Sequence, residues 1–74
     1  MKIVKVKMRL GPNPEDELNA VGYYDSDDNF IPHCENGPAD TYADGRLRWY
    51  WHGKPAEGVS SQEEFERWLK LRIF

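Results

Sequence analysis

The first ten residues alternate between apolar and charged side chains, and alternate residues of an extended chain point to opposite sides. The apolar side comprises Val4, Val6, Met8 and Leu10, and the basic side comprises Lys5, Lys7 and Arg9. A period of two over this length predicts a β-strand at residues 2–10 with one buried face and one basic face in water. Gly11-Pro12-Asn13-Pro14 ends this strand, because proline cannot donate to a strand ladder.

Residues 13–21 carry a different signal. Asn13 followed by Pro14 and a run of acids is typical of a helix start. Leu18, Ala20 and Val21 are the only apolar residues that follow at helical spacing. We therefore expect one short helical turn or a structured loop here.

Two hairpins are predicted further along the chain. Residues 21–24 and 30–31 are apolar or aromatic and flank the polar cluster 25–29, which indicates the first hairpin. Residues 40–43 and 46–51 flank Asp44-Gly45, a pair that suits a two-residue turn, and form the second. Alternation along 46–51 puts Leu47, Trp49 and Trp51 on one side and Arg46, Arg48 and Tyr50 on the other.

A helix is predicted from about Ser61 to Arg72. Serines 60 and 61 each have a glutamate three residues later, the pattern of a capping box. Phe65, Trp68 and Leu69 then form one apolar stripe. Together these elements predict an α+β fold, a small antiparallel sheet of about three to five strands with the C-terminal helix on one face. We expect that stripe to meet Val4, Val6, Met8, Leu47, Trp49 and Trp51.

Composition and charge add limits to this fold. The 74 residues are enough for one domain, residues 1–74, and contain a single cysteine, Cys34, which fits a reducing cytoplasm. No apolar run approaches the length that spans a bilayer. Charge is segregated into +4 over residues 1–10, −9 over 11–45 and +2 over 46–74, which add to the net −3. Such segregation is expected where acidic loops are simply solvated beside basic strands, where a basic and an acidic region meet inside the fold, or where each is offered to a different partner.

The residues that carry metal or catalytic chemistry are few. Adjacent His33 and Cys34 do not match the spaced ligand pairs of zinc sites, and on a strand they would point to opposite faces. Asp25-x-Asp27-x-Asn29 begins like a calcium loop, but Phe30 stands where that loop has its turn glycine. We therefore predict no catalytic residues, no metal and no cofactor.

Binding surfaces are the stronger prediction. If strand 2–10 pairs beside strand 46–51, one open sheet face carries Lys5, Lys7, Arg9, Arg46, Arg48 and Tyr50. Such a face suits docking on a larger protein by electrostatic steering or strand addition. Single-stranded nucleic acid is the alternative, since cations neutralise phosphates and rings stack on bases. A second candidate surface is the acidic hairpin with Asp25, Asp27 and Asp28, which suits a basic channel.

Residues 35–54 resemble one unit of a short repeat found in many phage and bacterial proteins of unknown role. That repeat has the form D-G-P-A … D-G-x-x-x-W-Y-x-N-G-K. The matching residues are Glu35-Asn36-Gly37-Pro38-Ala39, Tyr42-Ala43-Asp44-Gly45, Trp49-Tyr50 and Gly53-Lys54, with His52 where the repeat has Asn. Turn glycines and packed aromatics dominate this pattern, so the resemblance implies a fold element and assigns no functional residue.

In size, acidity and the presence of this repeat unit, the chain also resembles small phage-encoded regulators that bind and redirect host machinery. The resemblance implies a non-catalytic inhibitor or modulator that acts in the host cytoplasm. Within that class we expect a transcription regulator that contacts a large host complex such as RNA polymerase.

Overall fold

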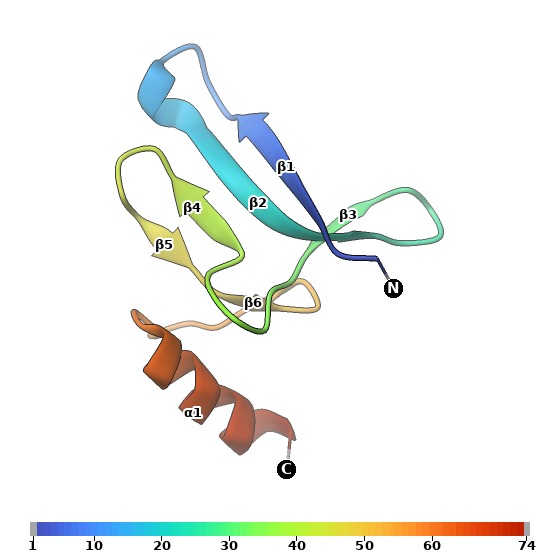
Figure 1. Ribbon diagram of the computed structural model, residues 1–74, viewed down its shortest axis with the longest axis vertical. Helices are drawn as coiled ribbons and strands as arrows, with labels where there is room; N and C mark the ends of the chain where they lie inside the picture. Colours follow the sequence, from blue (N-terminus) through green and yellow to red (C-terminus); the bar gives the residue numbers. More distant parts are fainter. Residues whose placement is uncertain (1, 74) are drawn as a thin grey trace.

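Two antiparallel sheets and one C-terminal helix make up the fold, which confirms the α+β prediction (Figure 1). The computed structural model describes residues 2–73, and for Ile73 it describes the backbone only. The elements in chain order are β1 (Val4–Arg9), the 3-10 turn η1 (Pro14–Asp16), β2 (Glu17–Tyr24), β3 (Phe30–Pro32), β4 (Asp40–Tyr42), β5 (Leu47–Arg48), β6 (Tyr50–Trp51), β7 (Lys54–Pro55) and α1 (Gln62–Ile73).

The larger sheet is built around β2. Its strand order is β1-β2-β4-β5, and β3 also pairs with β2. The short turn expected after Asn13 is present as η1, but the chain is already a strand from Glu17, which the sequence interpretation did not predict. Leu18 and Ala20 are both buried, so residues 17–21 follow a period of two. Pairing to β1 on one edge and β4 on the other overrides the weak helix signal.

The register of this sheet assigns each side chain to one of two faces, because paired residues share a face. Lys7 pairs with Asn19, Asn19 with Thr41, and Thr41 with Leu47. We call this the lysine face, and it also holds Lys5 and Arg9. The opposite face, here the arginine face, holds Val4, Val6, Met8, Leu18, Ala20, Asp40, Tyr42, Arg46 and Arg48.

The prediction that strand 2–10 pairs beside strand 46–51 is wrong. β2 and β4 lie between β1 and β5, because β1 pairs with the next strand along the chain. Leu47 consequently lies on the lysine face and is 44% exposed, so it does not contribute to the apolar side of the sheet. Leu10 lies just beyond β1 and is also exposed.

A hydrophobic core cluster forms where the chain leaves the larger sheet. Trp49 separates β5 from β6, and β6 pairs with β7 instead of continuing beside β4. Trp49 and Phe65 are buried together with Ala56. Trp51, Val59, Trp68 and Leu69 pack around them. The predicted contact between the helix stripe and the two tryptophans is thus confirmed.

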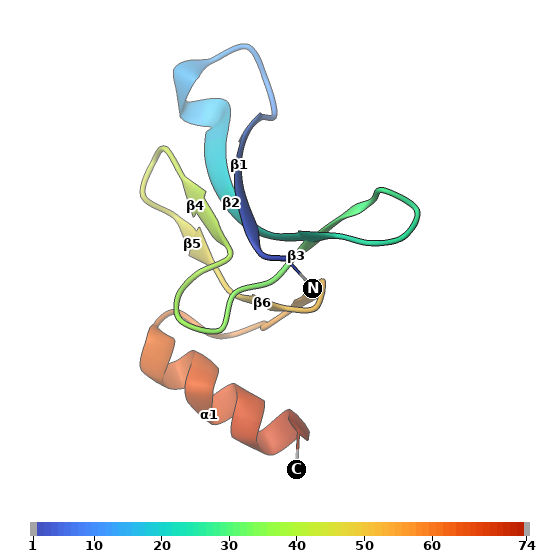
Figure 2. The ribbon, with the colours of Figure 1, turned by 45° about the vertical axis from the view of Figure 1, so that its right-hand side comes forward.

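The predicted contact of that stripe with β1 is wrong. Val4, Val6 and Met8 are only half-buried and do not belong to the cluster around Phe65. Both ribbon views show α1 beside β6, at the end of the molecule opposite the turn that joins β1 to β2 (Figures 1 and 2). The helix lies beside the small sheet because Trp49 packs in one cluster with Phe65 and its indole N–H donates to Gln62.

Specific hydrogen bonds fix the start of α1. The backbone N–H of Glu64 donates to Ser61 Oγ at 3.2 Å, which confirms a serine cap. The return bond to Glu64 Oε1 comes from the N–H of Ser60 at 3.3 Å, one residue before the cap, so the predicted capping box is formed only in part. The indole N–H of Trp49 donates to Gln62 Oε1 at 3.0 Å, so the buried ring also holds the first turn. In residues 2–73 there is no helix of the length and apolar character that crossing a membrane requires.

The turn between β4 and β5 differs in length from the prediction. Residues 43–45 form the loop, since the N–H of Tyr42 donates to the carbonyl of Arg46 and the N–H of Gly45 to that of Tyr42. Gly45 adopts a φ of 96°, the left-handed conformation that a three-residue hairpin loop requires at this position. Asp-Gly therefore marks the turn correctly, but the loop is one residue longer than predicted.

Candidate interaction site

A groove of about 490 Å³ runs along the outer edge of β5. Residues 46–50 line one side of it and residues 55–59 line the other. Arg46, Arg48 and Tyr50, three of the residues predicted to contact a partner, all contribute to this groove. Figure 1 shows β5 at the margin of the larger sheet, next to the segment that leads into α1.

The groove exists because the chain turns away from β5 after β7. The N–H of Ala56 donates to the carbonyl of Trp49 at 2.9 Å, which extends the pairing of β7 with β6 by one residue. Gly58 then adopts a φ of 80°, and the N–H of Val59 donates to the carbonyl of Ala56 at 3.4 Å. This tight turn leaves the outer edge of residues 46–48 without a neighbouring strand.

The two arginines of the groove have different surroundings. Arg46 is held locally, since its Nε lies 2.8 Å from Asp44 Oδ2 and its guanidinium lies 4.5 Å from the ring centroid of Tyr42. Arg48 pairs across the ladder with Asp40, but in the described residues no carboxylate lies within 4.0 Å of its guanidinium. Of the two arginines, Arg48 is therefore the more available to an incoming carboxylate.

Asp40, which lies opposite Arg48, and Tyr50, which lines the groove, both influence the charge near the two arginines. Burial raises the pKa of Asp40, and the positive charge of Arg48 opposes that rise. Burial also raises the pKa of Tyr50, with a further contribution from the negative charge of Asp40. Half-buried Tyr50 thus keeps its phenol proton at neutral pH and offers a hydrogen-bond donor in the same groove as the two arginines.

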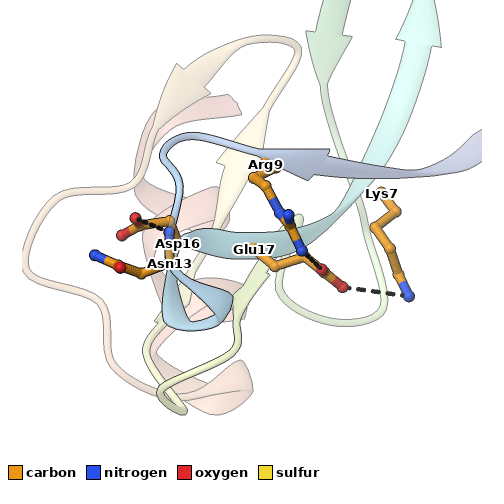
Figure 3. A network of polar contacts seen from close by, with 5 residues as sticks. All are labelled: Lys7, Arg9, Asn13, Asp16 and Glu17. Atoms are coloured by element: carbon orange, nitrogen blue, oxygen red, sulfur yellow. Dashed lines mark hydrogen bonds and ion pairs between the residues drawn. The ribbon is translucent and has the colours of Figure 1, made fainter.

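The other predicted cations lie on the opposite face. Glu17 accepts an ion pair from Lys7 at 3.3 Å and another from Arg9 at 3.3 Å, as Figure 3 shows. Hydrogen bonds from Lys7 and Arg9 lower the pKa of Glu17, so its charge persists and balances one of theirs. Lys5 lies on the same lysine face, across from Val21. The single basic face that joins these residues to Arg46 and Arg48 does not exist.

The acidic hairpin between β2 and β3 is shaped by one of its own carboxylates. Asp25 Oδ1 accepts hydrogen bonds from the backbone N–H groups of Asp27 and Asn29, each at 2.9 Å. Asp28 adopts a φ of 67°, and its N–H donates to the carbonyl of Asp25. Asp25 therefore forms an Asx-type turn. Asp27 and Asp28 remain exposed at the tip.

A pair of histidines forms a polar centre that the sequence interpretation missed. His33 is 1% exposed and stacks on His52, with ring centroids 4.1 Å apart. Its Nδ1 accepts the backbone N–H of His52 at 2.9 Å, and His52 Nδ1 lies 2.8 Å from the hydroxyl of Tyr23. The two residues meet only through the tertiary fold, so no local spacing announces them.

The second ring nitrogen of His33 has no hydrogen-bond partner among residues 2–73. Nε2 lies 4.0 Å from Glu35 Oε1, beyond hydrogen-bond distance. Burial is the main cause that lowers the pKa of His33, followed by the charge of His52, while the charge of Glu35 opposes it. Within residues 2–73, no three His, Cys, Asp or Glu side chains are grouped so that they could hold a metal ion.

Comparisons of the chain with protein-family models, with curated proteins and with solved structures found no match.

Proposed function

We propose that this chain is a non-enzymatic binding domain that docks on an acidic surface of a larger protein through the groove beside β5. The observation that carries the proposal is the meeting of Arg46, Arg48 and Tyr50 in one groove. Arginine and tyrosine are the side chains most enriched at the energetic centres of protein interfaces. Arg48, free of a carboxylate partner within 4.0 Å in the described residues, offers a bidentate donor to an incoming carboxylate.

The division of the cations between two faces favours a protein partner over nucleic acid. A single strand on a sheet needs one continuous basic platform with stacking rings. Here Lys5, Lys7 and Arg9 lie on the lysine face, whereas the two arginines of the groove lie on the arginine face. Titration with labelled oligonucleotides at two salt concentrations tests the alternative, since phosphate contacts make affinity fall steeply with salt.

The partner class stays the one predicted from size, acidity and the repeat unit. It is a large host complex such as RNA polymerase, which this chain would inhibit or redirect by occupancy. Net charge of −3 together with a cationic groove suits selective docking, because the acidic remainder repels other acidic surfaces.

Two matched charge reversals test the groove as the contact surface. Arg46→Glu with Arg48→Glu changes the charge by −4 on the arginine face, and Lys5→Glu with Lys7→Glu makes the same change on the lysine face. Each tagged variant is used to capture partners from bacterial lysate, and captured proteins are identified and then titrated in purified form. We expect the arginine reversal to abolish capture and the lysine reversal to leave it within about threefold, because rim charges contribute little. Equal capture by wild type and the arginine reversal would remove the groove from consideration.

A further inference from the structure

The backbone of β5 has an unpaired outer edge inside the groove. The carbonyl of Arg46 accepts from Tyr42 and that of Arg48 accepts from Ala39, each at 2.9 Å, so both point toward β4. Successive residues of an antiparallel strand direct their hydrogen-bonding groups to opposite sides. The N–H and carbonyl of Leu47 therefore point away from β4 and into the space beside the groove.

This edge continues a line of pairing that already exists. Ala56 pairs with Trp49 on the same outer side, and the chain then leaves this line at the turn around Gly58. If the chain continued straight after Ala56, its next residues would pair with residues 46–48. A strand added there would occupy that position. Three residues of extended chain span roughly 10 Å at about 3.3 Å each, which is the length of the edge at residues 46–48.

The outer edge of β1 is protected against such addition. β1 is six residues long, and its lysine face bears Lys5, Lys7 and Arg9. Charged residues, lysine above all, on edge strands discourage pairing with another chain. Residues 46–48 carry two charged side chains against three on β1, and the residue between the two arginines is the exposed Leu47.

The charges at β5 select the chemistry of the added strand. Side chains at alternate positions of that strand would lie beside Arg46 and Arg48, so acidic residues there would be stabilised. A second copy of this chain is disfavoured, because an antiparallel pair of β5 strands centred on Leu47 would place Arg46 opposite Arg48 of the other copy. Like charges directly opposite each other destabilise strand pairing.

We propose that an extended segment of the partner, with acidic side chains at alternate positions, adds as a strand to the outer edge of β5 in line with β7. This inference rests on the proposed function and specifies how the groove binds. Main-chain hydrogen bonds at Leu47 supply affinity, and the two arginines supply the preference for acidic side chains.

Two substitutions at position 47 separate backbone from side chain. Leu47→Pro removes the outward N–H, and an edge strand tolerates proline where its N–H faces outward. Leu47→Ala keeps that N–H and shortens the side chain. The probes are a blocked peptide of three Thr-Glu repeats, a Thr-Lys counterpart, and a Thr-Glu peptide N-methylated at its threonines, whose N–H groups face Leu47 in an antiparallel pair. Amide chemical shifts of isotope-labelled protein report where and how tightly each peptide binds.

We expect the Thr-Glu peptide to shift the amides of residues 46–48 and to bind about tenfold tighter than the Thr-Lys peptide. Leu47→Pro should weaken binding about tenfold, Leu47→Ala less than about threefold, and N-methylation of the peptide about tenfold. The N-methylated peptide keeps the test valid if the proline variant fails to fold.

Four results would overturn strand addition. They are absence of binding by the Thr-Glu peptide, shifts centred on β1, equal binding of the N-methylated peptide, and a concentration-dependent doubling of mass that protects the Leu47 amide. If the arginine reversal abolishes partner capture while Leu47→Pro and N-methylation change nothing, the proposed function stands and strand addition is wrong. If the arginine reversal leaves capture intact, the proposed function itself is wrong.

Discussion

Acidification should destabilise this protein through His33, well above the pH at which carboxylates titrate. In the fold Nδ1 of His33 accepts a backbone N–H from His52, and Nε2 is buried without a partner. A proton on Nδ1 would break that hydrogen bond and would place a buried charge against the ring of His52. The groups that face His33 are Tyr23, Trp51, His52 and Glu35, and only the carboxylate of Glu35 favours the protonated ring.

The direction of the effect follows from the lowered pKa of His33. The unfolded chain, in which the histidine has its ordinary pKa of 6.5, binds a proton first as the pH falls. The free energy of unfolding is therefore at its full value above about pH 7 and decreases as the pH falls from 6.5 toward the pKa of the folded state. One proton gives at most about 1.4 kcal/mol per pH unit, against a total of roughly 4–11 kcal/mol for a domain of this size.

Urea unfolding at several pH values between about 5.5 and 7.5 measures this slope. Glu17, Asp44 and Glu64 have lowered pKa values and titrate below that range. The raised pKa of Asp40 affects the wild type and a variant at His33 alike, so it does not change the difference between them. His33→Asn is the matched variant, because its side-chain oxygen can replace Nδ1 as the acceptor and does not titrate. We expect the difference in stability between wild type and variant to shrink as the pH falls. A constant difference across the range would refute the role assigned to His33.

Two further changes probe the cores of the fold. Trp49→Ala should lower the free energy of unfolding by about 3–5 kcal/mol, because the ring is 4% exposed and its N–H donates to Gln62. A urea titration measures this loss, and a loss below about 1 kcal/mol would contradict the packing described for Trp49. Gly22→Ala should separate β3 from β2, because a Cβ at this position would overlap the carbonyl oxygen of Ile31. The expected signature is loss of slow hydrogen exchange at the amide of His33, which donates to the carbonyl of Val21, and at that of Ile31, which points the same way along the ladder, with β1 unchanged. Full protection of these two amides would contradict it.

Local patterns in the sequence were enough to predict β1, α1 and both hairpins. The alternation of residues 4–9, the serine and glutamate of the helix cap and the Asp-Gly turn each operate within a few residues. The extent of β2 was harder to predict, because Asn13-Pro14 is a real helix-start signal that ends after one turn. Small buried residues such as Ala20 also give a weak strand signal.

Pairing between distant strands was beyond the reach of these local patterns. Placing β1 beside β5 brought the lysines and arginines onto one face, and the observed order puts two strands between them. Arg46, Arg48 and Tyr50 do line one groove, although Trp49 divides the predicted strand 46–51 into β5 and β6. The contact of His33 with His52 depends on the crossing of β3 and the β6–β7 turn, which no periodicity encodes.

The position of Trp49 between the two sheets divides the intrinsic chromophores of the protein. All three tryptophans, Trp49, Trp51 and Trp68, belong to the cluster around α1, whereas Tyr23, Tyr24 and Tyr42 belong to the larger sheet. Tryptophan fluorescence therefore reports on one half of the molecule, and far-ultraviolet circular dichroism reports on both. Coincident denaturation curves from the two signals mean one cooperative unit, and separated curves mean that the helical end melts by itself.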